Sequence, residues 1–262
     1  MTQVWSEVGV KSRLPSDATC VGLIPARAGS RRVPRKNVRL LAGHPLLAYT
    51  IGAALDSGVF AAVIVSTDST ETAALAQSYG AEVPFLRPID LARDTSPDID
   101  WVRHSLAGLA QQGRRWDCFA ILRPTSPFRR PDTIRRAWHE FVTDGHADSL
   151  RAVQPCREHP AKMWTIDGAR MHPVMANPDD AGTPWHSMPY QSLPPIHVQN
   201  ASLEIARCDA PLRLGSIAGE HIMPFFTRDL EGVDINTAED WLLAEHHASE
   251  HPEALPVVGS VG

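Results

Sequence analysis

Residues 21–37 read VGLIPARAGSRRVPRKN, and this segment decides the expected class of fold. Residues 21–25 form a short apolar run that ends at Pro25, which predicts a buried strand. The loop that follows combines Gly29 and Ser30 with five cations, which are Arg27, Arg31, Arg32, Arg35 and Lys36. Small residues let backbone N–H groups approach an anion closely, and the cations supply charge. The loop is a candidate cradle for a triphosphate, although a solvated basic loop has the same composition.

The rest of the chain alternates between strand-like and helix-like patterns. Apolar runs predict strands at 63–66, 119–122, 149–153, 201–205 and 222–226. Mostly helical patterns cover 45–55, 70–79, 99–111, 131–141 and 237–247. This alternation predicts an α/β fold, a Rossmann-like and mostly parallel sheet flanked by helices. Ligands of such sheets bind at the carboxyl ends of strands, so we expect the site just after Pro25, Ser66 and Leu122.

Short polar side chains occupy these expected positions. Ser66 and Asp68 follow one strand, and Thr125 and Ser126 lie in the LRPTSPFR segment (122–129) that follows another. They are suited to a base, a ribose or a metal, but helix caps and turns have the same composition. The loop at 24–37 has neither the Gly-Lys-Ser/Thr ending of a P-loop nor a Gly-x-Gly-x-x-Gly pattern. A different kind of nucleotide site is therefore expected.

The VDIN segment (233–236) is a candidate magnesium site. Asp234 and Asn236 are two residues apart, so in an extended backbone their oxygen atoms lie on one face. Such oxygens are the ligands that Mg²⁺ prefers. A loop that ends in a helix cap is the alternative interpretation.

Composition limits the classes of function. The formal net charge of −5 gives no global basic field for nucleic acid. No apolar run is long enough to cross a membrane, and residues 1–20 lack the apolar core of a signal peptide. The four cysteines are widely spaced, which favours reduced thiols and a cytoplasmic protein over a disulfide framework.

The organisation of the chain is interrupted once, by a segment rich in proline and aromatic residues. We expect an N-terminal extension (1–20), a nucleotide-binding core (21–154), an inserted region (155–198), a return to the core with the metal segment (199–248) and a flexible tail (249–262). The insertion is too apolar for a linker, so it is expected to pack on something, and a second subunit is one candidate.

Seven segments in order resemble the acylneuraminate cytidylyltransferase family, the CMP–sialic acid synthetases, with CMP–Kdo synthetases as relatives. They are IPARAGSRRVPRKN (24–37), VIVSTDS (63–69), EVPFLRPIDLARDTSPDID (82–100), LRPTSPFRRPDTI (122–134), HPAK (159–162), VQNASLEI (198–205) and VDINTAEDW (233–241). The resemblance implies transfer of CMP from CTP to an acidic sugar with release of pyrophosphate. It also implies Mg²⁺ dependence and a homodimer formed through the insertion.

The resemblance assigns residues to the CTP half of the site. Arg27, Arg31 and Lys36 are the expected catalytic cations, and Arg31 stands where the family usually has Lys. Asp234 is an expected Mg²⁺ ligand, and Asn236 replaces a second Asp. The expected nucleotide-binding residues are Ala26, Arg27, Gly29, Ser30, Asn37, Ser66, Asp68, Arg87 and Thr95.

The acceptor half departs further from the family pattern. Arg123 stands where Gln is common, and Tyr190 stands where an Arg from the partner subunit is common. We expect Arg123 to take over part of the anion binding lost at Tyr190. The expected acceptor-binding residues are Arg123, Thr125, Ser126, Lys162, Tyr190, Gln199 and Asn200. These departures leave open a Kdo-like acid or a phosphonate as acceptor, and a non-catalytic nucleotide-binding scaffold is the alternative from another class.

Overall fold

The computed structural model describes residues 13–30, 32–177 and 182–259. Its centre is a six-stranded sheet in the order β10-β6-β9-β5-β1-β4. The strands are β1 (Cys20–Pro25), β4 (Ala62–Ser66), β5 (Cys118–Ile121), β6 (Ser149–Pro155), β9 (His197–Arg207) and β10 (Ile222–Phe226). Strand β1 pairs in parallel with both β4 and β5, whereas β9 is antiparallel to β5. The predicted α/β class with a mostly parallel sheet is confirmed.

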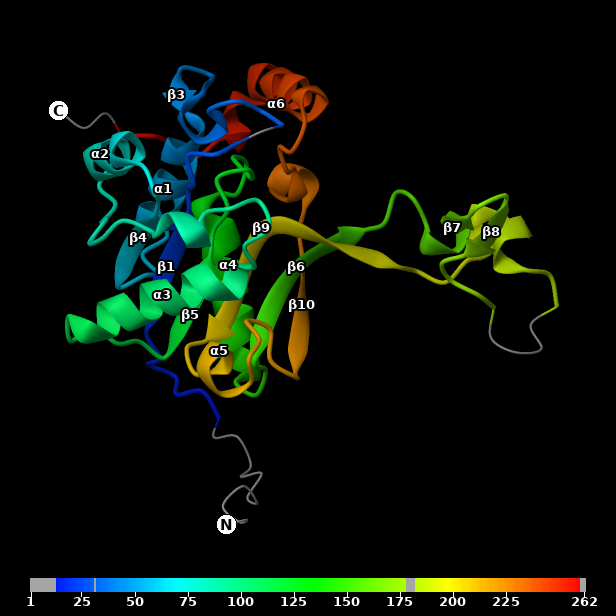
Figure 1. Cartoon of the computed structure of the whole chain (residues 1–262), viewed down its shortest axis with the longest axis horizontal. Coiled ribbons are helices and arrows are strands. Elements are labelled where there is room, and N and C mark those ends of the chain that lie inside the picture. The colour runs from blue at the N-terminus through cyan, green and yellow to red at the C-terminus, as the bar shows by residue number, and fades with distance from the viewer. Residues whose placement is uncertain (1–12, 31, 178–181, 260–262) are drawn as a thin grey trace, which may run out of the picture. The chain divides into compact units, whose positions relative to one another are not determined.

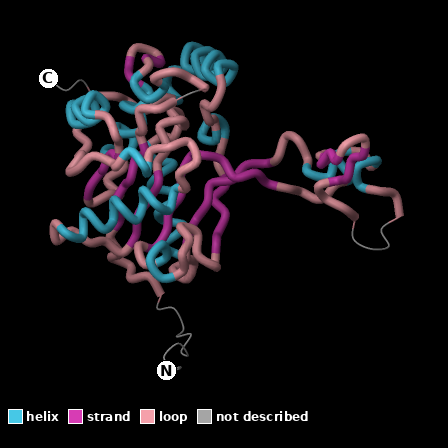
Figure 2. Tube along the Cα trace, viewed as in Figure 1, coloured by secondary structure: helices cyan, strands magenta, loops and turns pink. Residues whose placement is uncertain are grey.

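Helices cover both faces of the sheet, as Figures 1 and 2 show. Alternate residues of β1 point to opposite faces, so Ile24 belongs to one apolar cluster and Leu23 to another. The first cluster includes residues of α1 (Leu46–Asp56), α2 (Thr70–Ser78) and α4 (Pro131–Asp144). The second cluster is built against α3 (Asp98–Gln111), which crosses the near face of the sheet in Figure 1.

The helix boundaries follow from local chemistry. The side chain of Ser69 caps α2 by accepting a hydrogen bond from the Thr72 N–H at 3.2 Å. Helix α4 starts at Pro131, whose missing N–H is not needed in a first turn. It stops at Gly145, which adopts φ +67°.

A third apolar cluster fixes the loop that follows β1. Val33 and Leu41 pack there with Trp241 of α6 (Ala238–Glu250). The short hairpin of β2 (Leu40–Leu41) and β3 (His44–Pro45) belongs to the same region. The expected boundary at residue 248 falls inside α6, and Leu255 and Val258 pack on this cluster, so the segment after 248 has more structure than a flexible tail. The apolar side chains of Leu255 and Val258 explain why this segment packs on the core instead of forming the expected flexible tail.

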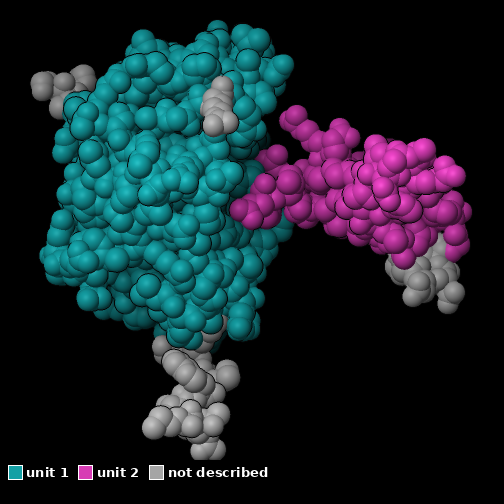
Figure 3. Space-filling view, viewed as in Figure 1, with its two compact units in different colours: residues 1–152, 200–262 teal, residues 153–199 magenta. Residues whose placement is uncertain are grey.

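The chain divides into two compact units, coloured separately in Figure 3. The first consists of residues 1–152 and 200–262, and the second of residues 153–199. The second unit contains the antiparallel pair β7 (Trp164–Asp167) and β8 (Arg170–Pro173). The segment expected to be an insertion, 155–198, lies within this unit.

Short helices complete the described elements. Helix α5 (Ala210–Arg213) follows β9. The 3₁₀ turns are η1 (Lys36–Val38), η2 (Ile89–Leu91), η3 (Pro160–Lys162), η4 (Trp185–Ser187), η5 (Tyr190–Ser192), η6 (Asp229–Gly232) and η7 (Pro252–Ala254). In the described part of the chain, no helix is long and apolar enough to cross a membrane.

Candidate functional site

A cleft of about 360 Å³ lies at the carboxyl ends of β1 and β5. This is the edge of the sheet where the sequence predicts a ligand site. The cleft brings together the basic loop, the segment after β5 and the VDIN segment. Its lining includes the predicted site residues Arg27, Gly29, Ser30, Lys36, Asn37, Arg123, Thr125, Asp234 and Asn236. A Cβ on Gly29 would meet no atom within 4 Å among the described residues, so open space lies beside this backbone.

Hydrogen bonds and one ion pair hold the first half of the basic loop. The Arg27 guanidinium pairs with Asp94 at 2.5 Å, and each side chain is about one-third exposed. The amide of Asn37 donates to the Arg27 carbonyl at 3.1 Å. The carboxylate of Asp68 accepts from the Ala28 N–H at 2.8 Å. Asn37 and Asp68 therefore shape the loop around Arg27.

The cations of the loop divide into two groups. Arg32 and Lys36 line the cleft together with Arg27. Arg35 instead pairs with Glu71 at 2.5 Å, and both of those side chains are exposed. The predicted catalytic residue Arg31 lies outside the described residues. Three described cations of the loop therefore line the cleft, together with Arg123 from the segment after β5.

Lys36 connects the basic loop to the VDIN segment. Its Nζ donates to the Ile235 carbonyl at 2.6 Å. Burial lowers the pKa of Lys36; Asp234 opposes this shift, and Arg32 adds to it. The Ile235 N–H donates to the Thr125 carbonyl at 2.9 Å, so the segment after β5 is attached at the same point.

Asp234 has the geometry of a side chain prepared for a cation. Its Oδ2 accepts a hydrogen bond from the Asn236 amide. Its Oδ1 is buried, and no donor among the described residues reaches it. A buried carboxylate oxygen without a donor is unfavourable unless a cation or water engages it. Mg²⁺ is commonly bound by one or two carboxylates together with substrate phosphates, so this residue fits the ion.

Asn236 and Thr237 also show the helix cap that was the alternative interpretation. Thr237 accepts from the Asp240 N–H at 3.2 Å, and Asp240 accepts from the Asn236 and Thr237 N–H groups at 2.8 Å each. The two interpretations are compatible, because the cap uses the backbone of Asn236 while its side chain contacts Asp234.

Two of the residues expected around the cytidine, Arg87 and Ser66, contact each other. Arg87 is buried, donates through Nε to the Ser66 hydroxyl at 3.0 Å, and lies 4.9 Å above the Trp101 ring. Burial lowers the pKa of Arg87 to about 10. The side chain of Ala26 is buried, whereas Thr95 is exposed. None of these predicted residues lines the cleft itself.

Arg123 is held by two carboxylates that the sequence did not reveal. Its Nη2 contacts Asp98 of α3 at 2.6 Å and Glu204 of β9 at 2.8 Å. Glu204 also pairs with Arg151 of β6. Burial raises the pKa of Asp98, but the ion pair and hydrogen bond with Arg123 bring it below its usual value. Only the folded sheet brings these residues together, so no local pattern in the sequence indicates the network.

A buried arginine supports the cleft from behind. The Arg129 guanidinium donates to the Ser202 carbonyl and, at 3.0 Å, to the Thr50 hydroxyl. Burial lowers the pKa of Arg129 to about 9. Two predicted acceptor residues are also buried here: Ser126, and Asn200, whose amide donates to the Thr227 hydroxyl at 2.9 Å. Neither of these two residues lines the cleft.

The remaining predicted acceptor residues belong to the second unit. Lys162 donates to the carbonyls of His186 and Met188 at 2.8 and 2.6 Å. The Tyr190 hydroxyl donates to the Cys156 carbonyl at 2.5 Å. Gln199 is the last residue of this unit and is exposed. These side chains fix the unit's internal structure, and their role toward an acceptor stays a prediction.

Comparisons with known proteins identify the family of the chain. A family model described as cytidylyltransferase matches residues 21–108. The CMP-N,N'-diacetyllegionaminic acid synthase of Legionella pneumophila is 39% identical over 238 residues, which are 90% of this chain and 98% of that protein. The N-acylneuraminate cytidylyltransferase of Escherichia coli is 46% identical over 123 residues, which are 47% of this chain and 28% of that protein.

A solved structure supports the fold. The CMP:2-keto-3-deoxy-manno-octonic acid synthetase complexed with CTP has a TM-score of 0.66 at 14% identity, and covers 89% of this chain and 100% of its own. The family model and the curated relatives show a protein of the nucleotidyltransferase class. With the full-length similarity to the Legionella enzyme, the chain belongs to the acylneuraminate cytidylyltransferase family.

Proposed function

We propose that this enzyme transfers CMP from CTP to a nonulosonic acid and releases pyrophosphate. The observation that carries the proposal is the cleft, because Arg27, Lys36 and Asp234 all line it at the carboxyl ends of β1 and β5. Cations suit a triphosphate, and a carboxylate suits the metal that accompanies it.

The reaction is an in-line displacement at the α-phosphorus. The anomeric hydroxyl oxygen of the acceptor forms the new P–O bond, and the bond to the β-phosphate oxygen breaks. The hydroxyl proton is released to water. Negative charge spreads over the phosphoryl oxygens in the transition state, and Arg27, Lys36 and Arg32 stabilise it as fixed cations.

The proposed reaction includes Mg²⁺, with Asp234 as its ligand from the protein. When bound, the ion would neutralise charge on the phosphate oxygens. Asp234 would hold it through the buried Oδ1, and Asn236 would orient the carboxylate through its hydrogen bond to Oδ2. Among the described residues no cluster of three or more His, Cys, Asp or Glu side chains has metal-binding geometry, so substrate oxygens and water would supply the other ligands.

The proposed acceptor is a di-N-acetylated nonulosonic acid of the legionaminic type. Support comes from the Legionella relative, whose similarity extends over 98% of its length. Within this chain, the charge network at Arg123 also supports an acidic acceptor. Both carboxylates engage Nη2, and a guanidinium carries further N–H donors that suit the acceptor's carboxylate.

The enzyme is further proposed to be a homodimer and to act in the cytoplasm. Several large apolar side chains of the second unit are exposed, among them Ile166, Met171 and Val174, and an apolar surface of this kind suits a subunit contact. CTP is made in the cytoplasm, which is where its consumer is expected.

The acceptor is tested by pyrophosphate release from CTP with four acids supplied in parallel. These are N,N'-diacetyllegionaminic acid, N-acetylneuraminic acid, pseudaminic acid and Kdo. We expect the highest kcat/KM with the legionaminic acid. A higher value with Kdo would contradict the proposed acceptor and leave CMP transfer itself in place.

A further inference from the structure

Arg129 is a buried cation that no carboxylate among the described residues accompanies. Its exposed fraction is 1%, and within those residues its guanidinium donates to oxygen atoms of neutral groups. Its Nε is buried, and no acceptor in the described part of the chain reaches it. A buried charge without an opposite charge is unfavourable, and apolar side chains of similar volume are often at least as stable in the place of buried charges. Stability alone therefore gives no reason for an arginine at this position.

The Arg129 guanidinium joins three segments that are far apart in the sequence. Nη1 donates to the Arg123 carbonyl at 3.3 Å and to the Ser202 carbonyl of β9. Nη2 donates to the Thr50 hydroxyl of α1 at 3.0 Å, and this hydroxyl donates to the Arg123 carbonyl at 3.4 Å. The planar fork of an arginine serves several acceptors in a fixed geometry, which a lysine ammonium does not. Arg129 therefore fixes the segment after β5 relative to both β9 and α1.

Two of these three segments supply residues to the cleft. Arg123 and Ala201 both line it, and Ala201 directly precedes Ser202. Arg129 itself is not part of the lining. The ion pairs described above hold the side chain of Arg123, whereas Arg129 holds its carbonyl group. Loss of the Arg129 contacts would therefore displace two parts of the cleft wall together.

We propose that Arg129 is a positioning residue for the acceptor, which it serves by holding the Arg123 backbone against β9. This inference rests on the proposed transfer of CMP to an acidic sugar that Arg123 helps to bind. The CTP half of the cleft has attachments of its own, because Lys36 donates to the Ile235 carbonyl and the Ile235 N–H donates to the Thr125 carbonyl. Changes in the Arg129 contacts should therefore affect the acceptor more than CTP.

The test is steady-state kinetics with CTP and the acceptor varied in turn. The acid that gives the wild type its highest rate is used, so the comparison does not depend on which acid that is. Arg129→Lys keeps the charge and loses the fork, and Thr50→Val removes the hydroxyl and leaves the arginine in place. Each should raise the acceptor KM about fivefold or more while the CTP KM stays within about twofold, because misplaced binding groups act on the substrate they contact. Thr50→Ser retains a hydroxyl and should bring the acceptor KM back near the wild-type value.

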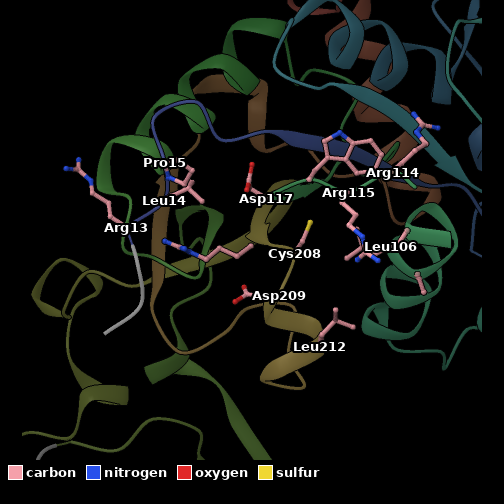
Figure 4. A pocket seen from close by; sticks show the side chains of 14 residues that line it. Arg13, Leu14, Pro15, Leu106, Arg114, Arg115, Asp117, Cys208, Asp209 and Leu212 are labelled. Carbon is pink, nitrogen blue, oxygen red and sulfur yellow. The ribbon is translucent and has the colours of Figure 1, made fainter. Parts of the chain in front are cut away.

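Arg207 provides a matched control at the other edge of the sheet. Its guanidinium also donates to backbone carbonyls, those of Gly145 and Ala147, at 2.7 and 3.1 Å. It lines a different pocket, of about 470 Å³, which shares no residue with the cleft lining and where Figure 4 shows Asp117, the residue before β5. Arg207→Lys therefore loses the same kind of contact far from Arg123, and it should leave both KM values within about twofold.

Hydrogen exchange without substrates tests the contact separately from the reaction. The backbone amides of residues 123–126 and 201–203 should exchange faster in Arg129→Lys than in the wild type, and at the wild-type rate in Arg207→Lys. Unchanged acceptor KM values in Arg129→Lys and Thr50→Val, or equal rises in the KM for acceptor and CTP, overturn the positioning role. Thr50→Val keeps the test decisive if Arg129→Lys does not fold. A wild type that releases no pyrophosphate with any acid contradicts the proposed function instead, and the exchange rates then still decide whether Arg129 holds the two segments.

Discussion

At the scale of single residues, Arg27 and Arg35 form a matched pair in the basic loop. Arg27 lines the cleft, whereas Arg35 points to Glu71. Arg27→Ala should lower kcat about 100-fold or more, since a fixed cation for the transition state is lost. Arg35→Ala should leave kcat within about twofold, because an exposed ion pair contributes little. Steady-state assays of pyrophosphate release measure both, and equal losses would return the loop to the status of a solvated basic surface.

The second residue-scale prediction separates Asp234 from Asn236. Asp234→Ala should abolish activity, and added Mg²⁺ should not restore it, because the charged oxygen for the cation is gone. Asn236→Ala should be milder and should raise the Mg²⁺ concentration needed for half-maximal rate. A magnesium titration of both variants measures this difference. Identical behaviour would mean that the segment serves as a helix cap only.

Two variants, one at Arg123 and one at its partner Asp98, should differ in their effect on the acceptor KM. Arg123→Gln leaves Asp98 and Glu204 with less compensation and removes a cation from the cleft. The acceptor KM should therefore rise about tenfold or more, as expected for loss of a charge-assisted bond, while the CTP KM changes little. Asp98→Asn leaves Arg123 more positive, so the acceptor KM should stay the same or fall. A rise in both variants would contradict this role.

The sequence revealed side chains but not their partners. The small and cationic residues after β1 predicted an anion site at the carboxyl end of this strand. Their loop does line a cleft there, and its binding of an anion stays a prediction. Arg32 was visible as one of the loop's cations but was not singled out for the cleft. Glu204 looked like any polar residue of a strand, and its contact with Arg123 spans 81 positions. Local patterns cannot show such a contact.

At the scale of elements, helix α6 holds the VDIN segment through its capping box. Thr237 and Asp240 bond each other's backbone N–H groups just beyond Asn236. Thr237→Ala should lower the free energy of unfolding by about 1 kcal/mol, whereas Thr237→Ser should retain most of it. Chemical denaturation measures this change. Equal stability of both variants and the wild type would show that the cap contributes nothing.

The predicted elements match the observed ones where periodicity is strong. The strands at 63–66 and 222–226 lie within a residue of β4 and β10, because each is a short apolar run. The predicted strand at 201–205 lies inside β9, which starts at His197 and ends at Arg207. Its first residues are exposed, so they lack the apolar signal. Its antiparallel orientation depends on chain topology, which periodicity does not encode.

At the scale of the whole molecule, we expect a dimer. Light scattering coupled to gel filtration should give twice the mass of the chain. Ile166→Asp with Met171→Asp, both exposed in the second unit, should shift the mass toward one chain because charges oppose burial at a contact. A monomeric wild type at assay concentration would contradict the expected assembly.

In the proposed reaction, the α-phosphorus of CTP is transferred to an acidic sugar. CTP labelled with ³²P at the α position and, in a parallel reaction, at the γ position tests this directly, with product separation by chromatography. We expect α-label in a CMP–sugar and γ-label in pyrophosphate, with ATP, UTP and GTP much poorer donors. Label from the γ position in the sugar, α-label in free CMP alone, or equal rates with all four nucleotides would contradict it.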